Sequence, residues 1–479
     1  MADSNIINKG FNSQTKNSSG NAPDAANETV LHAGDVKIEE ISIISSLGMV
    51  FAIPQYLVEL NLFEDMFRSG LYGNVLIIDA LNLAEVVPLR GEEFLRLKIR
   101  TPSMTAAIHK TFKIYSVTDR RMLGEPNKQS YVMHFCSPEI YIDILSPIWK
   151  SYKGKISDVV GDIYKTHLQT SRNGEPNDET PLFILGETAN SIQYISPGWT
   201  PAQNINWLAT RSIGSGYKNP GYLFFESNKA FYFANTEAII DQTIQTKGIY
   251  NNYIYTPQNL SYKDPEKPSV EYIKDVDTEY KKIESLEVLE TLNHLKATQA
   301  GYFANRLFTV DVLKKDYAIF DYDHVGNYND YAHLENIGNL TNPEIMPMSA
   351  ATARNPAAAA AFYPRSLALF DDQPNNVSEI IQEIVTRRRS TLSEYDNLKL
   401  LITVPGRTDA EVGNVIYLNY PNIKPRDKDD AALGNQDPMF SGFYLVTAIR
   451  HKFTLIKHTM TMEIVKDSIQ RPLGGLRNN

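Results

Sequence analysis

The sequence contains a single cysteine among its 479 residues. One cysteine cannot form an intrachain disulfide, and it cannot supply a zinc site built from several thiolates. Cys136 stands in the apolar run 131–136, so we interpret it as a small buried strand residue rather than a reactive thiol. The fold must therefore be stabilised by packing.

Long apolar runs are absent as well. No run approaches the roughly 18 apolar residues of a membrane helix, and residues 1–34 lack a charged segment followed by an apolar core. We therefore expect that the chain does not insert into a membrane and that it is made and kept in the cytosol. Residues 1–34 are rich in Asn, Ser and Gly and are predicted to be a disordered arm, and residues 471–479 a loose tail.

Basic residues are too few to balance the acidic ones. The formal net charge is −9 and the isoelectric point is about 5.6, which argues against a protein that grips nucleic acid through its phosphates. The chain has 27 Tyr and 20 Phe, which favours β-rich packing and large contact surfaces. Its length predicts about three domains.

Residues 58–83 carry the pattern around which the rest of the chain is arranged. Val58, Leu60 and Leu62 alternate with Glu59 and Asn61, the period of a strand with one buried face. The run breaks at residues 68–70, and 75–78 restart a second strand. Residues 95–99 and 112–116 alternate in the same way, so at least four strands share one sheet or barrel.

A similar pattern returns near the other end of the chain. Leu398, Leu400, Ile402 and Val404 alternate, a turn at 405–406 follows, and 415–418 and 444–449 supply further strands. We predict an α+β, β-rich fold in which one β-barrel module occurs twice. The expected domains are 35–117 (first β module), 118–245 (α+β), 246–394 (insertion or linking region) and 395–470 (second β module).

Helices are expected between the two modules. Thr200, Pro201 and Gln203 form the capping box of a helix that begins at residue 201, and an aromatic hairpin follows at 223–233. Within the insertion we predict a helix bearing Ile283, Leu286, Leu289, Leu292 and Leu295, a low-complexity surface connection at 349–364, and a helix at 377–389. The three arginines at 387–389 would cap that last helix.

One segment has the start of a calcium-binding loop. Residues 321–326 place acidic groups at the first loop positions, with His333 farther on. Val325 and Ala332 stand where such a loop needs an oxygen ligand and a bidentate Glu, so we predict a solvated, tyrosine-rich turn. The sequence has no G-x-S-x-G and no H-E-x-x-H motif, and we predict no enzyme activity and no catalytic, cofactor-binding or metal-binding residue.

Several stretches together resemble the baseplate hub proteins of contractile-tailed phages, which are related to the upper part of type VI secretion spike proteins. They are FEDMFRSGLYGNVLIID with VPLRGEEFLRLKIRTP, ISPGWTPAQNINWLATRS with GYLFFES, and SGFYLVTAIRHKFT with MEIVKDS. The resemblance covers about 35–468. It implies two tail-tube-like barrels per subunit and a homotrimer whose six barrels form a pseudo-sixfold ring.

The resemblance also implies partners and contacts. A tail tube or tube-initiator protein would dock above, a trimeric central spike below and peripheral baseplate proteins outside, and DNA would pass without specific binding during ejection from the virion. The candidate interface residues lie in two loops: Glu64, Asp65, Phe67, Arg68, Leu71, Tyr72, Arg407 and Asp409. The alternative is that they only cap their own barrels.

Two other functions are considered. One is a cell-wall hydrolase carried in the tail tip, and the other is a spike component of a contractile secretion system. No recognisable extra domain follows Ser468, where either a lytic domain or a long β-helical extension would be expected.

Overall fold

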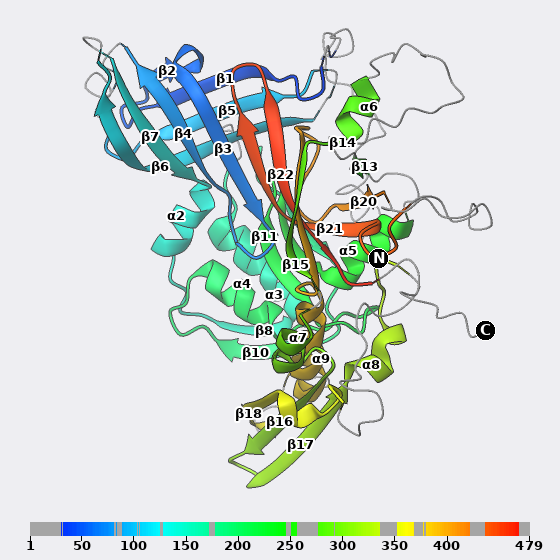
Figure 1. The fold of residues 1–479 in the computed structure, drawn as a ribbon. Coiled ribbons are helices and arrows are strands. Elements are labelled where there is room, and N and C mark those ends of the chain that lie inside the picture. The colour runs from blue at the N-terminus through cyan, green and yellow to red at the C-terminus, as the bar shows by residue number, and fades with distance from the viewer. Residues whose placement is uncertain are drawn as a thin grey trace, which may run out of the picture.

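The structure is a computed structural model. Its three regions follow one another from top to bottom in Figure 1. A large sheet lies at the top, helices α2, α3 and α4 lie below its first part, and a small sheet with α7 and α9 lies at the bottom. The residues that the structure describes are 30, 32–80, 83, 89–102, 104, 106–124, 128–171, 178–245, 251–255, 276–291, 293–335, 352–367, 377, 380–421 and 436–468.

The first β module consists of antiparallel strands with apolar residues on one face. Its strands are β1 (Lys37–Ile44), β2 (Val50–Ala52), β3 (Leu57–Asp65), β4 (Tyr72–Asp79), β5 (Phe94–Arg100), β6 (Ala107–Met122) and β7 (Gln129–Cys136), with a 3₁₀ turn, η3 (Pro54–Tyr56), before β3. They pair in the order β3-β4-β7-β6-β5-β1-β2. Leu95, Leu97 and Ile99 of β5 are fully buried, so the alternation predicted there is confirmed.

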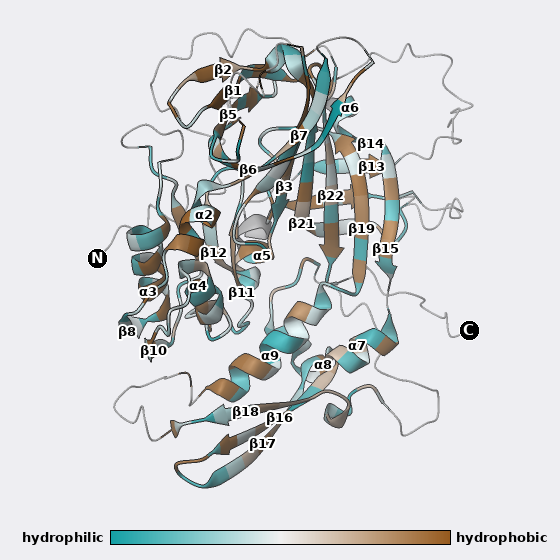
Figure 2. Cartoon of the chain, turned by 90° about the vertical axis from the view of Figure 1, so that its left-hand side faces the viewer, coloured by the Kyte–Doolittle hydropathy of each residue, from teal (hydrophilic) through white to brown (hydrophobic). Residues whose placement is uncertain are grey.

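The second β module draws its strands from two distant parts of the chain. They are β13 (Asn252–Tyr255), β14 (Lys282–Ile283), β15 (Ser285–Thr291), β19 (Leu398–Pro405), β20 (Val415–Asn419), β21 (Gly442–Phe453) and β22 (His458–Lys466), with α6 (Val276–Lys281) before β14. β15, β19, β22 and β21 pair in succession, and Figure 2 shows β22, β19 and β15 side by side. All four apolar residues predicted to alternate at 398–404 are fully buried.

One ladder joins the two modules. β3 pairs antiparallel with β21 from Asp65 opposite Ala448 to Leu60 opposite Phe453. The blue β3 and the red β21 of Figure 1 therefore belong to a single 14-stranded sheet. This confirms the β-rich α+β class. The ladders of the described residues form an order that branches at β21 and has open ends, so two closed barrels stay a prediction.

The region below the first module mixes short strands and helices. Its elements are α2 (Pro138–Leu145), β8 (Ser151–Lys155), α3 (Ile156–Ile163), a π turn η4 (Tyr164–Leu168), β9 (Leu182–Leu185), β10 (Ser191–Ile195), α4 (Pro201–Ala209), β11 (Tyr222–Glu226), β12 (Phe231–Asn235) and α5 (Thr236–Gln245). Thr200 and Gln203 form the predicted capping box of α4, and β11 and β12 form the predicted aromatic hairpin.

The lowest region is a three-stranded sheet covered by a helix. It contains α7 (His294–Ala300), β16 (Ala304–Asp311), β17 (Asp316–Asp323), α8 (His324–Asn327), η5 (Tyr328–Asp330), η6 (Pro356–Ala358), β18 (Ala360–Arg365) and α9 (Ile381–Glu394). The amide of Asn305 on β16 donates to the Thr386 carbonyl and the Ser390 hydroxyl of α9. In Figure 2, α9 runs between this sheet and the large one.

Three predictions for the insertion are wrong. Ile283 belongs to β14 and residues 285–291 form β15, because pairing with β13 and β19 respectively provides backbone partners that outweigh a helix-like spacing. Part of the alanine run, 360–361, begins β18, which pairs with β16. Arg387, Arg388 and Arg389 lie within α9, which continues to Glu394.

Several strands also lie across the predicted domain boundaries. β7 extends the first module beyond residue 117, and β13, β14 and β15 come from the predicted insertion but pair within the second module. We therefore propose a first module of 35–136 and a second module that combines 251–291 with 395–468. The charged loop at 424–430, most of the arm 1–34 and the tail 471–479 lie outside the described residues. Within the described part, no helix is long and apolar enough to cross a membrane.

Candidate functional site

The loop 66–71, between β3 and β4, carries most of the candidate interface residues. Its backbone is fixed at both ends, because Met66 N–H donates to Thr447 O (2.9 Å) and Leu71 N–H donates to Glu226 Oε2 (3.0 Å). A Cβ on Gly70 would lie 2.5 Å from the Ile140 side chain, so a larger residue there would require that side chain to move. The loop is therefore held against both β21 and the α+β region.

A buried charged cluster lies beneath this loop. Lys110 of β6 forms an ion pair with Glu226 of β11, and its Nζ lies 3.4 Å from Glu139 Oε2 of α2. All three side chains are at most 3% exposed. Burial raises the pKa of Glu226 to about 7; the Glu139 charge also raises it, and Lys110 opposes the shift. The cluster joins the first β module to the region below it.

A second buried cluster lies on the seam between β3 and β21. Glu64 Oε1 is 3.2 Å from His451 Nε2, and His451 Nδ1 is 3.1 Å from His458 Nε2. The other Glu64 oxygen accepts from Val412 N–H at 3.3 Å. Burial, with a smaller effect of His451, lowers the pKa of His458 well below its ordinary value, so His458 is neutral. The cluster fixes the two modules relative to each other.

The second module is also bonded to the α+β region. Glu411 accepts from Ser227 Oγ (2.8 Å) and pairs with Lys229 Nζ (2.7 Å), and Asn228 donates to Ala410 O (2.9 Å). The turn of the aromatic hairpin therefore binds the loop that follows β19. Both β modules are therefore bonded to the same α+β region.

The structure divides the eight candidate interface residues into two groups. Glu64 and Leu71 are 1% and 0% exposed and have partners within this chain, His451 and Glu226, so their role in contacts between barrels stays a prediction. Arg407 and Asp409 pair with each other at 2.7 Å. Burial raises the pKa of Asp409, but the hydrogen bond and charge of Arg407, together with the Lys229 charge, outweigh this and keep the pKa below its ordinary value.

The exposed candidates are those of the loop tip. Phe67 is 56% exposed, Arg68 carries a 64% exposed side chain, and Asp65 pairs with Arg68 at 3.4 Å. Tyr72 is half-buried beside them. Arg68 and Tyr72 line one side of a surface cavity of about 380 Å³, with Ile140 and Asp143 of α2 across it. This loop tip stays a candidate contact surface.

Sequence reasoning missed the two histidines of the seam. His451 lies on the same strand face as Ile449 and Phe453, so the alternation of β21 marks it as buried. A histidine in that position needs a buried partner. The partner, Glu64, is 387 residues away in the chain and could not be identified from spacing.

The predicted solvated turn at 321–333 is partly buried. His324 is fully buried and Tyr328 is 6% exposed. His333 lies close to two acidic groups from elsewhere in the chain, Glu394 and Asp467. Burial lowers the pKa of His333, but the hydrogen bond with Asp467 and the Glu394 charge raise it to about 9. This trio is the group of side chains in the described residues that could hold a metal ion.

Cys136 is buried near the same loop as the Lys110 cluster. Burial, with the negative charges of Glu226 and Glu139, raises the pKa of its thiol to about 11. The thiol is therefore protonated at neutral pH, which agrees with its interpretation as a packing residue.

No protein-family model matches the sequence, and no curated protein matches it. The structure is similar to solved phage tail and baseplate proteins and to components of type VI secretion systems. A tail protein of Neisseria meningitidis MC58 matches with 9% identity and a TM-score of 0.48, over 90% of this chain and 97% of that one.

Two further structures show the range of these similarities. The 43 kDa tail protein of prophage MuSo2 from Shewanella oneidensis matches with 9% identity and a TM-score of 0.46, over 90% of this chain and 99% of that one. A chain of the Francisella PdpA-VgrG complex matches with 11% identity and a TM-score of 0.44, over 93% of this chain and 60% of that one.

Proposed function

We propose that this protein is the structural hub of a contractile-tail baseplate. Three copies would form a ring of six β modules that joins a sixfold tail tube to a threefold central spike, and the ring would form part of the DNA conduit. The observation that carries the proposal is the β3–β21 ladder, which places the two β modules of one chain side by side in one sheet.

The seam explains why such a ring would be regular. A closed homotrimer repeats each surface three times. If each chain contributes two similar modules with a fixed orientation, the ring presents six similar positions to one partner and three to another. Glu64, His451 and His458 supply that fixed orientation, because a buried hydrogen-bonded cluster specifies one arrangement of the strands around it.

The charge and the surface of the chain support an assembly role. The net charge of −9 would let DNA pass a channel without adhering to its wall. Exposed large apolar side chains lie at hairpin tips of both modules: Leu47 is 81%, Met122 93% and Ile456 80% exposed. These side chains are available for contacts with other proteins. We infer that the chain acts by binding and not by catalysis.

The mass of the purified full-length chain tests the proposal. Native mass spectrometry and sedimentation should give three times the chain mass of 54.1 kDa, at micromolar concentration or after addition of the spike. Cryo-electron microscopy of that species should show a threefold ring with six similar lobes around a bore. A monomer under all these conditions, or hydrolysis of purified peptidoglycan, would contradict the proposal.

A further inference from the structure

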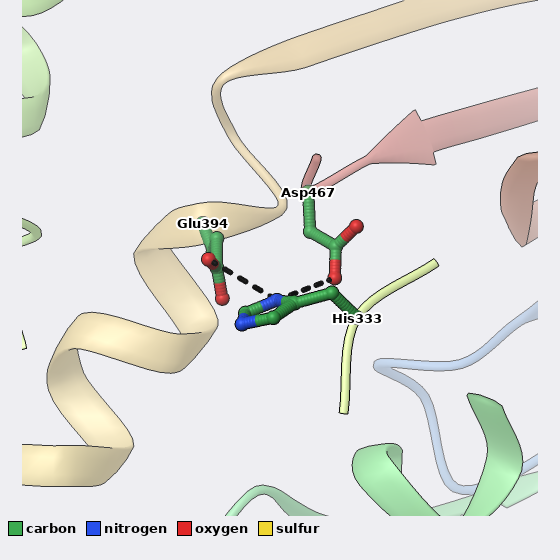
Figure 3. Close-up of side chains that lie close together, drawn as sticks. All are labelled: His333, Glu394 and Asp467. Carbon is green, nitrogen blue, oxygen red and sulfur yellow. Dashed lines mark hydrogen bonds and ion pairs between the residues drawn. The ribbon is translucent and has the colours of Figure 1, made fainter. Parts of the chain in front are cut away.

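Three segments that are distant in the chain bring potential metal ligands together. His333 follows η5, Glu394 ends α9 and Asp467 follows β22, and Figure 3 shows their side chains pointing toward one another. His333 Nδ1 lies 3.2 Å from Asp467 Oδ2 and 3.8 Å from Glu394 Oε1. All three side chains are at most 8% exposed.

The ring of His333 is oriented by its other nitrogen. Nε2 lies 2.8 Å from the carbonyl oxygen of Tyr328, which can only accept, so Nε2 carries a proton. The ring also stacks on Tyr328 with centroids 3.8 Å apart. Nδ1 therefore faces the two carboxylates. A histidine that binds a metal typically donates its remaining N–H to a carbonyl or carboxylate in this way.

Asp467 is oriented in a similar manner. Its Oδ1 accepts from Ser468 Oγ at 2.6 Å and from Leu334 N–H at 3.2 Å. The Leu334 N–H also lies 3.3 Å from Oδ2, and the same oxygen faces His333 Nδ1 at 3.2 Å. The carboxylate is thus held by its own neighbours on one side and presents an oxygen to the imidazole on the other.

Glu394 supplies an independent indication of a ligand. Its Oε1 is buried and accepts no hydrogen bond from any described residue, although it lies 3.5 Å from His324 Nε2, which also has no hydrogen-bond partner there. A proton on His333 Nδ1 can form a hydrogen bond with Asp467 Oδ2, but Glu394 Oε1 is then still without a hydrogen bond. Burying an unpaired carboxylate oxygen is costly, whereas a cation between the three atoms would interact with all of them.

We propose that His333 Nδ1, Glu394 Oε1 and Asp467 Oδ2 bind a divalent transition-metal cation, with Zn²⁺ the best match to one nitrogen and two oxygen ligands. Ligands 2.0–2.2 Å from a tetrahedral Zn²⁺ are about 3.3–3.6 Å apart, close to the separations of 3.2 and 3.8 Å from Nδ1. His324 Nε2 is the candidate fourth ligand, and Tyr322 hydrogen-bonds its other nitrogen at 3.2 Å.

The role of such a cation would be structural. It would link the end of α9, the segment after η5 and the end of the second β module, which otherwise meet through hydrogen bonds such as Asp467 to Leu334. Because its ligands come from positions 333, 394 and 467, the cation would stabilise only the folded chain. The inference does not depend on the trimer.

The test uses full-length chain stripped with a chelator and then given Zn²⁺ or Co²⁺ alone. After desalting, the wild type should retain about one Zn²⁺ per chain and unfold at a higher temperature than the stripped protein. Co²⁺ bound in place of Zn²⁺ should give the visible absorption bands of a tetrahedral site. Glu394→Gln and His333→Gln should weaken binding by at least about 100-fold, because even residues that only orient a ligand contribute 10–100-fold.

Glu383→Gln is the matched control, because Glu383 lies on the same helix but its side chain is 40% exposed and paired with Arg387. It should bind Zn²⁺ as the wild type does. Equal binding by Glu394→Gln and the wild type, or a wild type whose unfolding temperature Zn²⁺ leaves unchanged, would overturn the proposal. If the variants fail to fold by circular dichroism, the wild-type Co²⁺ spectrum decides, and the absence of its bands also overturns it.

Discussion

The imidazole Nε2 of His451 lies 3.2 Å from the carboxylate Oε1 of Glu64, and both side chains are buried between β21 and β3. These residues belong to different β modules. Their contact makes the relative position of the modules a property of the chain itself, which an assembled ring would then repeat.

Removal of Glu64 should therefore destabilise the seam strongly. Glu64→Ala leaves His451 Nε2 and the Val412 amide without their acceptor, and each buried polar group left unpaired costs about 1–3 kcal/mol. Urea unfolding followed by tyrosine fluorescence measures the change. Glu59→Ala is the matched control, because Glu59 is on the same strand and pairs with Lys452 but is partly exposed. It should cost less than about 1 kcal/mol. Similar losses for the two variants would contradict a special role for the seam.

The buried Glu226 should make stability depend on pH. Its pKa is about 7 in the folded chain, against 4.5 ordinarily. Between these values the folded chain holds a proton that the unfolded chain has released, so stability falls as pH rises. The contribution of Glu226 to the free energy of unfolding is fully present below pH 4.5 and is lost above about pH 7. It amounts to roughly 3 kcal/mol.

Glu226→Gln should flatten that pH dependence. The free energy of unfolding, measured in urea from pH 5 to 8, should fall less steeply for the variant than for the wild type. Glu187→Gln is the control, because Glu187 is an exposed partner of Lys155, and its curve should run parallel to the wild type. A parallel curve for Glu226→Gln would show that Glu226 does not titrate in this range.

Local sequence patterns predicted the elements whose stabilising contacts are local. The capping box at Thr200 involves residues three positions apart, and the alternation at 398–404 reports a buried face directly. The alternation of β3 was only partly correct. A bulge between Leu57 and Glu59 shifts the strand by one residue, so Leu57 is buried and Val58 is 37% exposed.

The features that sequence patterns could not predict depend on partners far along the chain. Residues 285–291 have a spacing that also suits a helix, and only the pairing with β19 makes them a strand. Glu64 was placed at an interface because of its position near a loop, whereas its partners are His451 and Val412. The trio of His333, Glu394 and Asp467 likewise exists only after folding.

The turn after β19 should not tolerate a side chain. A Cβ on Gly406 would lie 2.1 Å from the ring of His458, which is buried and cannot move aside. Gly406→Ala should therefore destabilise the protein by about 1–3 kcal/mol through overpacking. Gly216→Ala, where no atom lies within 4 Å of the added carbon, is the control and should have little effect. Unfolding temperatures of the two variants test this, and equal values would mean that His458 can shift.

A charge at the tip of the β3–β4 loop should weaken the proposed trimer without weakening the fold. Phe67 is 56% exposed, so Phe67→Glu removes little buried area within the chain. If the loop tip packs against a neighbouring copy, an unpaired charge there should raise the dissociation constant about 10-fold to 100-fold, the loss expected at an important interface residue.

Sedimentation across a concentration series measures that constant, and Phe362→Glu is the control. Phe362 is 66% exposed but lies on β18 in the lowest region, away from both β modules. The expected result is a weaker trimer for Phe67→Glu alone, with unchanged unfolding temperatures for both variants. If the two variants assemble equally well while the wild type is a trimer, the loop tip is not part of the interface. The contact between copies must then lie elsewhere, and the exposed hairpin tips at Leu47, Met122 and Ile456 are the next positions to substitute.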